Sequence, residues 1–428
     1  MMTGVNQINF DHGTKTYDGS IRKLHSKQTV SIVFSICSLM IIAFSSRSWN
    51  AISSSNSGRY LTPENDVYYQ EYYNVHSNDK NVPGVLPIQN YPVGQGSVIA
   101  LLVSSRPQDI QEAQIALRSL AFLKGDKDPE HPAPVLIFNE GDLPDKAIKA
   151  LIASTNRPIA FPLVNFMLFP AGFNPEIETH KFVVKGRKPW GYYQMIRFWI
   201  TMIWKHPAIQ RFDAVMRMDS DSCFKERNDY LPNFMYDGLY YHSQYVGVEP
   251  EHGANFIQGM YDFAINWMMK TKQPVEPRNT LLWHFIDSAW KTEKTLPVFR
   301  TNFELSKVGL MQRGDVARFH DAITEKDPYP MLRNRWGDAV LRFLMIAIFE
   351  TNDRVLTVRP TGYFHKAGCS ADEVNKALKE FDSSTDFHIE EVTNEEVLKT
   401  QEQKEKNDKL LANRPEPVKY SHLVDTLV

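Results

Sequence analysis

Short, continuous apolar runs alternate with segments of helical periodicity, and this alternation limits the possible folds more than any other feature. The runs SVIALLVSS (97–105) and PVLIFNE (134–140) have the length and composition of strands buried on both faces of a sheet. Each is followed by a stretch with apolar residues at helical spacing, over 108–125 and 144–155. Strands and helices in this order predict a doubly wound α/β sheet.

The same pattern continues toward the C-terminus. YYQMIRFWITMIWKH (192–206) predicts an aromatic helix, and FDAVMRM (212–218) predicts the next buried strand. A second apolar helix is expected over 336–349 and another strand over 354–360. From about Phe381 the chain becomes strongly charged, which is typical of a solvated helix or a mobile tail.

Size and charge exclude some classes of protein. A chain of 428 residues, 43% of them hydrophobic, can bury a large core. Its net charge is −2 and its Lys and Arg residues are scattered, so no positive field favours nucleic acid. We therefore expect no nucleic-acid partner.

An uncharged segment of 19 residues, 28–46, is about long enough for one membrane crossing. Four basic residues precede it and only Arg47 and Arg59 follow closely, so the positive-inside rule places the N-terminus in the cytosol. The alternative is a cleaved signal peptide, because Ala43-Phe44-Ser45 resembles a cleavage site. The long leader favours an uncleaved, single-pass type II anchor, and its short span fits a Golgi membrane.

These signals divide the chain into five parts. The expected order is a cytosolic tail (1–27), a transmembrane anchor (28–46), a luminal stem (47–95), a single folded domain (96–380) and a charged C-terminal tail (381–428). The stem is rich in Ser, Asn, Tyr and Pro and shows no sustained periodicity.

The chain has three cysteines, Cys37, Cys223 and Cys369, and no CxxC or Cys/His ladder. A structural zinc site is therefore not expected. Cys37 lies in the apolar segment, which leaves Cys223 and Cys369 either as a disulfide pair or as two buried thiols.

Asp219 and Asp221 follow the predicted strand 212–218 directly, in MDSDSCF. Ligands of open α/β sheets bind beyond the carboxyl ends of strands, and paired carboxylates there can chelate a hard divalent cation bound to a diphosphate. The simpler alternative is an acidic turn. An acidic turn would be favoured for the tripeptide alone, but its position after a predicted strand makes the metal site and the turn about equally well supported.

Four more residues are candidates for a site. His365, just past a predicted strand, could complete a carboxylate-rich Mn²⁺ site or could be structural. Glu304 and Asp338 are acids in apolar surroundings, where a carboxylate needs a partner or a role. Glu304 could pair with Arg300 or Lys307, and Asp338 could be a helix N-cap. Tyr192 could contact a sugar or pack in the core.

Five segments, taken in order along the chain, resemble the fungal-type α-1,2-mannosyltransferases of glycosyltransferase family 15. They are PWGYYQMIRF, KHPAIQRFDAVMRMDSDSCF, NFELSK, RWGDAVLRFLMIAIF and TGYFH. The similarity extends over about 97–370. It implies a GT-A-like, Rossmann-like mixed sheet flanked by helices. It also implies a type II Golgi enzyme that transfers mannose from GDP-mannose with retention, using Mn²⁺.

The resemblance also implies roles for particular residues. Asp219 and His365 fall at metal-binding positions, with Asp221 a possible helper. Glu304 matches the carboxylate proposed as nucleophile, and Tyr192 matches a tyrosine implicated in acceptor binding. Two further residues, Arg217 and Asp338, match positions placed at the active site.

The chain also departs from the family. The first metal-binding carboxylate is an Asp in place of Glu, Ile196 replaces a cysteine, and Ser104-Ser105 replaces an Arg-Asn after the first strand. We expect a mannosyltransferase that acts on an oligosaccharide or glycoprotein acceptor in protein glycosylation. The alternatives are a GT-A transferase that uses another nucleotide sugar, and a catalytically silent glycan-binding or assembly protein of the Golgi.

Overall fold

The computed structural model describes residues 96–123, 133–178, 190–210, 212–228, 234, 241–243, 246–250, 257–274, 279–292, 295–357, 362–381 and 388–412. The predicted cytosolic tail, membrane anchor and stem lie outside these residues and stay predictions. Among the helices of the described part, none combines the length and the apolar character needed to cross a membrane.

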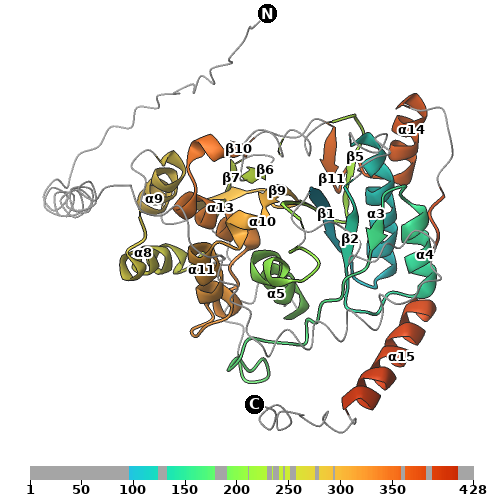
Figure 1. Ribbon diagram of the computed structural model, residues 1–428, viewed down its shortest axis with the longest axis horizontal. Coiled ribbons are helices and arrows are strands. Elements are labelled where there is room, and N and C mark those ends of the chain that lie inside the picture. Colours follow the sequence, from blue (N-terminus) through green and yellow to red (C-terminus); the bar gives the residue numbers. More distant parts are fainter. Residues whose placement is uncertain are drawn as a thin grey trace, which may run out of the picture. The chain divides into compact units, whose positions relative to one another are not determined.

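A mixed sheet of seven strands forms the centre of the fold (Figure 1), in the order β10-β6-β9-β4-β1-β2-β3. Strands β1, β2, β3 and β4 are parallel to one another, and β10 is parallel to β6. Strand β9 lies between β4 and β6 and runs antiparallel to both. The strands are β1 Ser97–Leu102, β2 Val135–Phe138, β3 Ile159–Ala160, β4 Ala214–Met218, β6 Tyr241–Ser243, β9 Phe303–Lys307 and β10 Val355–Thr357. The predicted α/β class with a mixed sheet is confirmed.

The apolar strands are continuous runs because both faces of the sheet are covered. In β1, Val98 and Ala100 pack into one hydrophobic cluster, while Ile99 and Leu101 pack into the other. Successive strand residues point to opposite faces, so a strand covered on both sides needs apolar residues at every position.

Helices cover the two faces unequally. The cluster that holds Ile99 takes residues from α3 (Pro107–Ser119), the 3-10 turn η2 (Leu120–Phe122), α4 (Asp145–Ala153), α14 (Ala371–Phe381) and α15 (Asn394–Ala412). The cluster that holds Val98 takes residues from α5 (Trp190–Arg197), α6 (Ile203–Lys205), α8 (Met260–Thr271), α9 (Thr280–Thr292), α10 (Val308–Met311), α11 (Gly314–Thr324), α12 (Pro330–Asn334) and α13 (Asp338–Phe349). A 3-10 turn, η4 (Asn352–Arg354), precedes β10.

The predicted aromatic helix is present but contains a π-helical turn. Phe198–Met202 forms this turn between α5 and α6, and the helix ends at Lys205, before Pro207. Its aromatic residues Phe198, Trp199 and Trp204 are buried in the hydrophobic core. Single π turns inside α-helices are frequent near functional sites.

Two small antiparallel sheets complete the described strands. Strand β5 (Ser222–Phe224) pairs with β11 (Tyr363–His365), and β7 (Val246–Pro250) pairs with β8 (Thr295–Phe299). Gly362, just before β11, has φ +69°, and a Cβ there would lie 2.5 Å from Glu226 Cβ. Only glycine fits this close approach, which brings β11 alongside β5.

Helix α15 lies within the charged segment that was predicted to be a solvated helix or a mobile tail. Helix α15 lies next to α4 (Figure 1). Val397 on α15 is buried, and Glu396 Oε1 lies 3.6 Å from Lys146 Nζ of α4. Gln401 donates a hydrogen bond to Ser105 at the end of β1. The helix expectation is therefore confirmed, and α15 packs on the folded domain.

Candidate functional site

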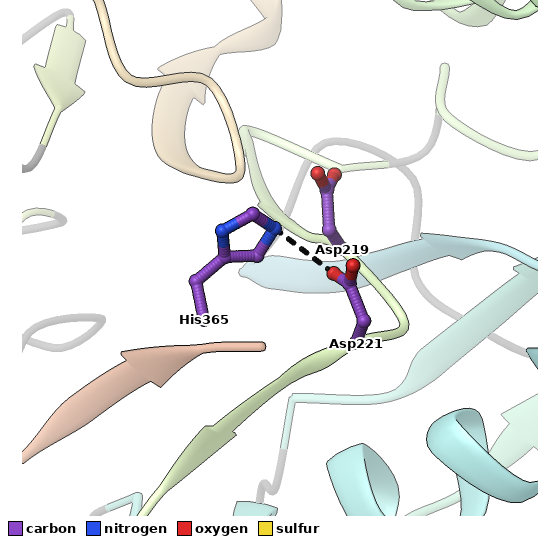
Figure 2. A group of neighbouring side chains, drawn as sticks. All are labelled: Asp219, Asp221 and His365. Carbon is purple, nitrogen blue, oxygen red and sulfur yellow. Dashed lines mark ion pairs between the residues drawn. The ribbon is translucent and has the colours of Figure 1, made fainter. Parts of the chain in front are cut away.

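Asp219, Asp221 and His365 lie together at the carboxyl end of β4 (Figure 2). Their nearest ligand atoms are all within 4.8 Å of one another, and His365 Nε2 is 3.1 Å from Asp221 Oδ1. A tight turn sets the two carboxylates, because the Ser222 amide donates to the Asp219 carbonyl before β5 begins. Pairing of His365 with Ser222 in the β5–β11 ladder then brings the imidazole to the turn. The structure thus brings together the three residues predicted for a metal site, and we call these candidate ligands the metal cluster.

Burial and neighbouring charges shift the pKa values of the two carboxylates in opposite directions. Burial raises the pKa of Asp219, and the nearby carboxylates Asp338 and Asp221 raise it further, although the charge of Arg217 opposes them. Burial also acts to raise the pKa of Asp221, but the hydrogen bond from His365 and the charge of Lys366 bring it below its usual value. Two carboxylates and an imidazole form a donor set that fits a divalent cation such as Mn²⁺.

A disulfide between Cys223 and Cys369 closes this part of the chain. Cys223 lies in β5, two positions after Asp221, and Cys369 lies four positions after His365. The Lys366 amide also donates to the Asp221 carbonyl at 2.8 Å. Of the two possibilities left open for these cysteines, the structure therefore has the disulfide.

Arg217 connects the metal cluster to the rest of the site. It projects from β4 and is buried, and its Nε and Nη2 each lie 3.2 Å from Asp219 Oδ1. Its Nη1 donates to Asp338 Oδ2 at 2.8 Å. The guanidinium stacks 4.3 Å from the Trp199 ring, in the π-helical turn. Arg217 thus holds one carboxylate on each side in fixed positions.

Asp338 is the first residue of α13, and its side chain does not cap the helix. The N-cap position is Gly337, without a side-chain cap, and the Asp338 carboxylate accepts instead from Arg217 and from Thr301 Oγ1 at 2.9 Å. Burial acts to raise the pKa of Asp338, but Arg217 and the two hydrogen bonds lower it below its ordinary value. The N-cap alternative is therefore wrong, and Asp338 is an ionised neighbour of the metal cluster.

Glu304 lies in β9, directly opposite Arg217 in the β4–β9 ladder. Only 1% of the residue is exposed, and its carboxylate accepts from Tyr241 Oη at 2.7 Å and from Arg342 Nε at 3.0 Å. Neither Arg300 nor Lys307, the partners considered from the sequence, makes this pair. Residues of a strand three positions apart point to opposite faces, which separates Lys307 from the carboxylate.

Tyr192 stands at the start of α5, half-buried against the apolar cluster. Burial and the nearby charge of Asp338 raise the pKa of Tyr192, so the hydroxyl keeps its proton at neutral pH. Arg335 lies 5.3 Å from its ring centroid. The sequence alternatives of substrate contact and core packing are therefore both compatible with this position.

The replaced residues after the first strand take part in a separate polar cluster. Ser105 Oγ donates to Asp142 Oδ2 at 2.6 Å, and Gln401 of α15 donates to Ser105 Oγ at 3.1 Å. The adjacent Ser104 bonds to Asp109 in α3. These contacts lie at the carboxyl ends of β1 and β2, the sheet edge that also carries the metal cluster.

Sequence reasoning missed Thr301, Tyr241 and Arg342, which hold the site carboxylates. Thr301 and Tyr241 lie in no recognisable sequence pattern. All three residues meet their partners only through pairing of distant strands or packing of α13. Arg342 offered one signal, because a charged residue within the apolar run of 336–349 must have a buried partner.

Comparison with known proteins places these features in a family. The sequence profile described as glycolipid 2-alpha-mannosyltransferase matches residues 177–400, more than half of the chain. The glycolipid 2-alpha-mannosyltransferase of Saccharomyces cerevisiae is 19% identical over 291 residues, 65% of this chain and 64% of that protein. The O-glycoside alpha-1,2-mannosyltransferase omh1 of Schizosaccharomyces pombe is 21% identical over 188 residues, 44% of this chain and 47% of that protein. The chain thus spans between about half and two thirds of these relatives.

Solved structures share the fold. Core-mannan synthase A (CmsA/Ktr4) of Aspergillus fumigatus, in an Mn/GDP form, has a TM-score of 0.53 at 17% identity and covers 62% of this chain and 74% of its own. The mannosyltransferase Ktr4p of S. cerevisiae in complex with GDP has a TM-score of 0.53 at 14% identity and covers 72% and 82%. With the extent of the profile match, the resemblance read from five short segments is confirmed, and the chain belongs to the glycolipid 2-alpha-mannosyltransferase family.

Proposed function

We propose that this chain transfers mannose from GDP-mannose to a mannose-terminated glycan, with retention of configuration and in α-1,2 linkage. The observation that carries the proposal is the cluster of Asp219, Asp221 and His365 at the end of β4. Family membership supports mannose transfer, and the Mn/GDP and GDP forms of the two structural neighbours support a metal-bound guanosine diphosphate.

Mn²⁺ is the proposed metal, held by Asp219 and His365 with Asp221 beside them. A cation at this position would screen the charge that develops on the departing diphosphate. The chain's own residues fix the site: Arg217 orients Asp219, and the β5–β11 ladder holds Asp221 and His365 at a set separation.

We assign the remaining predicted residues to the sugar, to the acceptor, or to support of the residues that contact them. Asp338 is kept ionised by Arg217, and we assign it to accept a hydrogen bond from a sugar or acceptor hydroxyl. The protonated Tyr192 hydroxyl can donate to the acceptor. The Glu304 carboxylate lies next to the Arg217 guanidinium and balances part of its positive charge.

The acceptor and the location are proposed from the sequence. A glycan on a lipid or protein would meet the domain in the Golgi lumen if 28–46 anchors the chain as a type II membrane protein. This placement would suit protein glycosylation.

The test uses the full-length chain with Mn²⁺ and a panel of nucleotide sugars, with release of GDP or UDP followed with and without mannose acceptors. We expect release of GDP from GDP-mannose, increased by a mannoside and abolished in Asp219→Ala and His365→Ala. Asp213→Asn, at the opposite end of the same strand, is the matched control and should keep full activity. Release of UDP alone would favour a transferase with another nucleotide sugar. Glycan binding without any turnover would favour the silent protein.

A further inference from the structure

Both oxygens of the Glu304 carboxylate are held by donors inside the protein. Oε2 accepts from Tyr241 Oη at 2.7 Å and from Arg342 Nε at 3.0 Å, and Oε1 accepts from Arg342 Nη2 at 3.3 Å. A carboxylate that attacks a sugar must bring a lone pair to within about 3–3.5 Å of the anomeric carbon. Any movement of the Glu304 carboxylate toward a sugar would have to break these three bonds.

Arg342 cannot follow such a movement. It is fully buried on α13, and its Nη2 also donates to the Trp199 carbonyl at 2.8 Å, in the π-helical turn. The guanidinium further lies against the thioether sulfurs of Met311 and Met345. If Glu304 left, a guanidinium would remain buried without its carboxylate, which is strongly unfavourable.

Arg217 lies between the Arg342–Glu304 ion pair and Asp219 of the metal cluster. Arg217 Nη1 lies 3.9 Å from Glu304 Oε1, while its Nε and Nη2 hold Asp219. A continuous series of ion pairs therefore runs from Arg342 through Glu304 and Arg217 to Asp219. Three carboxylates (Glu304, Asp219 and Asp338) face two guanidiniums, so one negative charge is already in excess. Loss of either guanidinium would increase that excess.

We propose that Arg342 is a positioning residue that keeps Glu304 as the fixed counter-ion of Arg217 and away from the anomeric carbon. This inference rests on the proposed function. It requires transfer without a mannosyl ester of Glu304. The bond from C1 to the diphosphate oxygen breaks, and its electron pair goes to that oxygen. The acceptor hydroxyl oxygen bonds to C1 on the same face, and the hydroxyl proton passes to the departing diphosphate.

A double-mutant cycle in the full-length chain tests the connection. Arg342→Gln and Glu304→Gln should each lower kcat about 10- to 100-fold and weaken Mn²⁺ binding, with little change in the KM for donor. Because Arg342 acts through Glu304, the double variant should be no worse than Glu304→Gln alone. Effects that multiply in the double variant, or single variants with unchanged kcat and Mn²⁺ affinity, would overturn the proposal.

A control and a rescue experiment complete the test. Arg197→Gln breaks another Arg–Glu pair, which is partly buried, with Arg197 Nη2 at 2.6 Å from Glu325 Oε2. It should lower stability without changing kcat or Mn²⁺ affinity. Azide added to Glu304→Ala should form no mannosyl azide, whereas rescue with an inverted azide product would identify Glu304 as a nucleophile. Mn²⁺ affinity, measured by electron paramagnetic resonance, needs no sugar chemistry. A wild-type protein without GDP release would therefore refute the proposed function and still leave the coupling measurable.

Discussion

Replacing Cys223 and Cys369 together with alanine should lower the free energy of unfolding by several kcal/mol and weaken the metal cluster. The two cysteines are 146 residues apart in the sequence. For a loop of this length, the chain-entropy account of a cross-link gives about 5 kcal/mol, and most measured disulfides contribute roughly 2–4 kcal/mol. We therefore expect a loss of about 2–5 kcal/mol.

The same cross-link holds the strands that carry two of the metal-site residues. Asp221 directly precedes β5 and His365 is the last residue of β11. Because the β5–β11 ladder has only three residue pairs, the disulfide contributes a large part of the restraint on their separation. Loss of the bond should therefore also lower the affinity for Mn²⁺.

Urea unfolding of the full-length chain, with and without dithiothreitol, measures the first effect. The reductant should shift the wild-type midpoint to lower urea and leave the double alanine variant unchanged, which separates the cross-link from any change in packing. Titration with Mn²⁺ under the same two conditions measures the second effect. An identical wild-type midpoint in oxidised and reduced protein would refute the reasoning.

Two further predictions concern stability. Burial lowers the pKa of His206 to about 4, whereas the unfolded chain titrates near 6.5, so the unfolded state binds more protons between these values. The free energy of unfolding should thus fall by about 3 kcal/mol from pH 7 to pH 4 on account of this residue, and His206→Gln should remove that part of the slope in denaturant titrations at several pH values. On α15, Val397 is 7% exposed and Leu398 is 58% exposed. Val397→Ala should cost about 2 kcal/mol, Leu398→Ala should be nearly neutral, and equal losses in thermal unfolding would show that α15 does not pack as described.

The strands that sequence reasoning located are those whose signal is local. Residues 98–103 are apolar throughout and 212–218 are mostly apolar, because helices cover both faces of the sheet. This pattern is visible in the sequence without knowledge of the neighbouring strands. Strand β9 carries no such signal, since Phe303–Lys307 mixes apolar and polar residues. It becomes a central strand only by pairing with β4 and β6, which lie about 60 to 90 residues earlier in the sequence.

The candidate site divides in the same way. Asp219 and Asp221 stand next to a predicted strand, so their location followed from the sequence. The partners of Glu304 did not, because Tyr241 and Arg342 reach it from β6 and α13. The state of the cysteines also depended on a distant contact, the antiparallel ladder of β5 and β11.

The geometry also shows how an Asp can serve where the family has Glu. Both hydrogen bonds from Arg217 to Asp219 end on Oδ1, so Oδ2 is the oxygen that can turn toward a cation. Asp221 Oδ1 and His365 Nε2 lie 3.1 Å apart, close enough for one cation to replace their hydrogen bond with a bond to each. Asp221 can therefore supply the reach that the shorter Asp219 lacks. On this argument Asp221→Asn should weaken Mn²⁺ binding nearly as much as Asp219→Asn. A tenfold smaller effect would leave Asp219 as the principal carboxylate ligand.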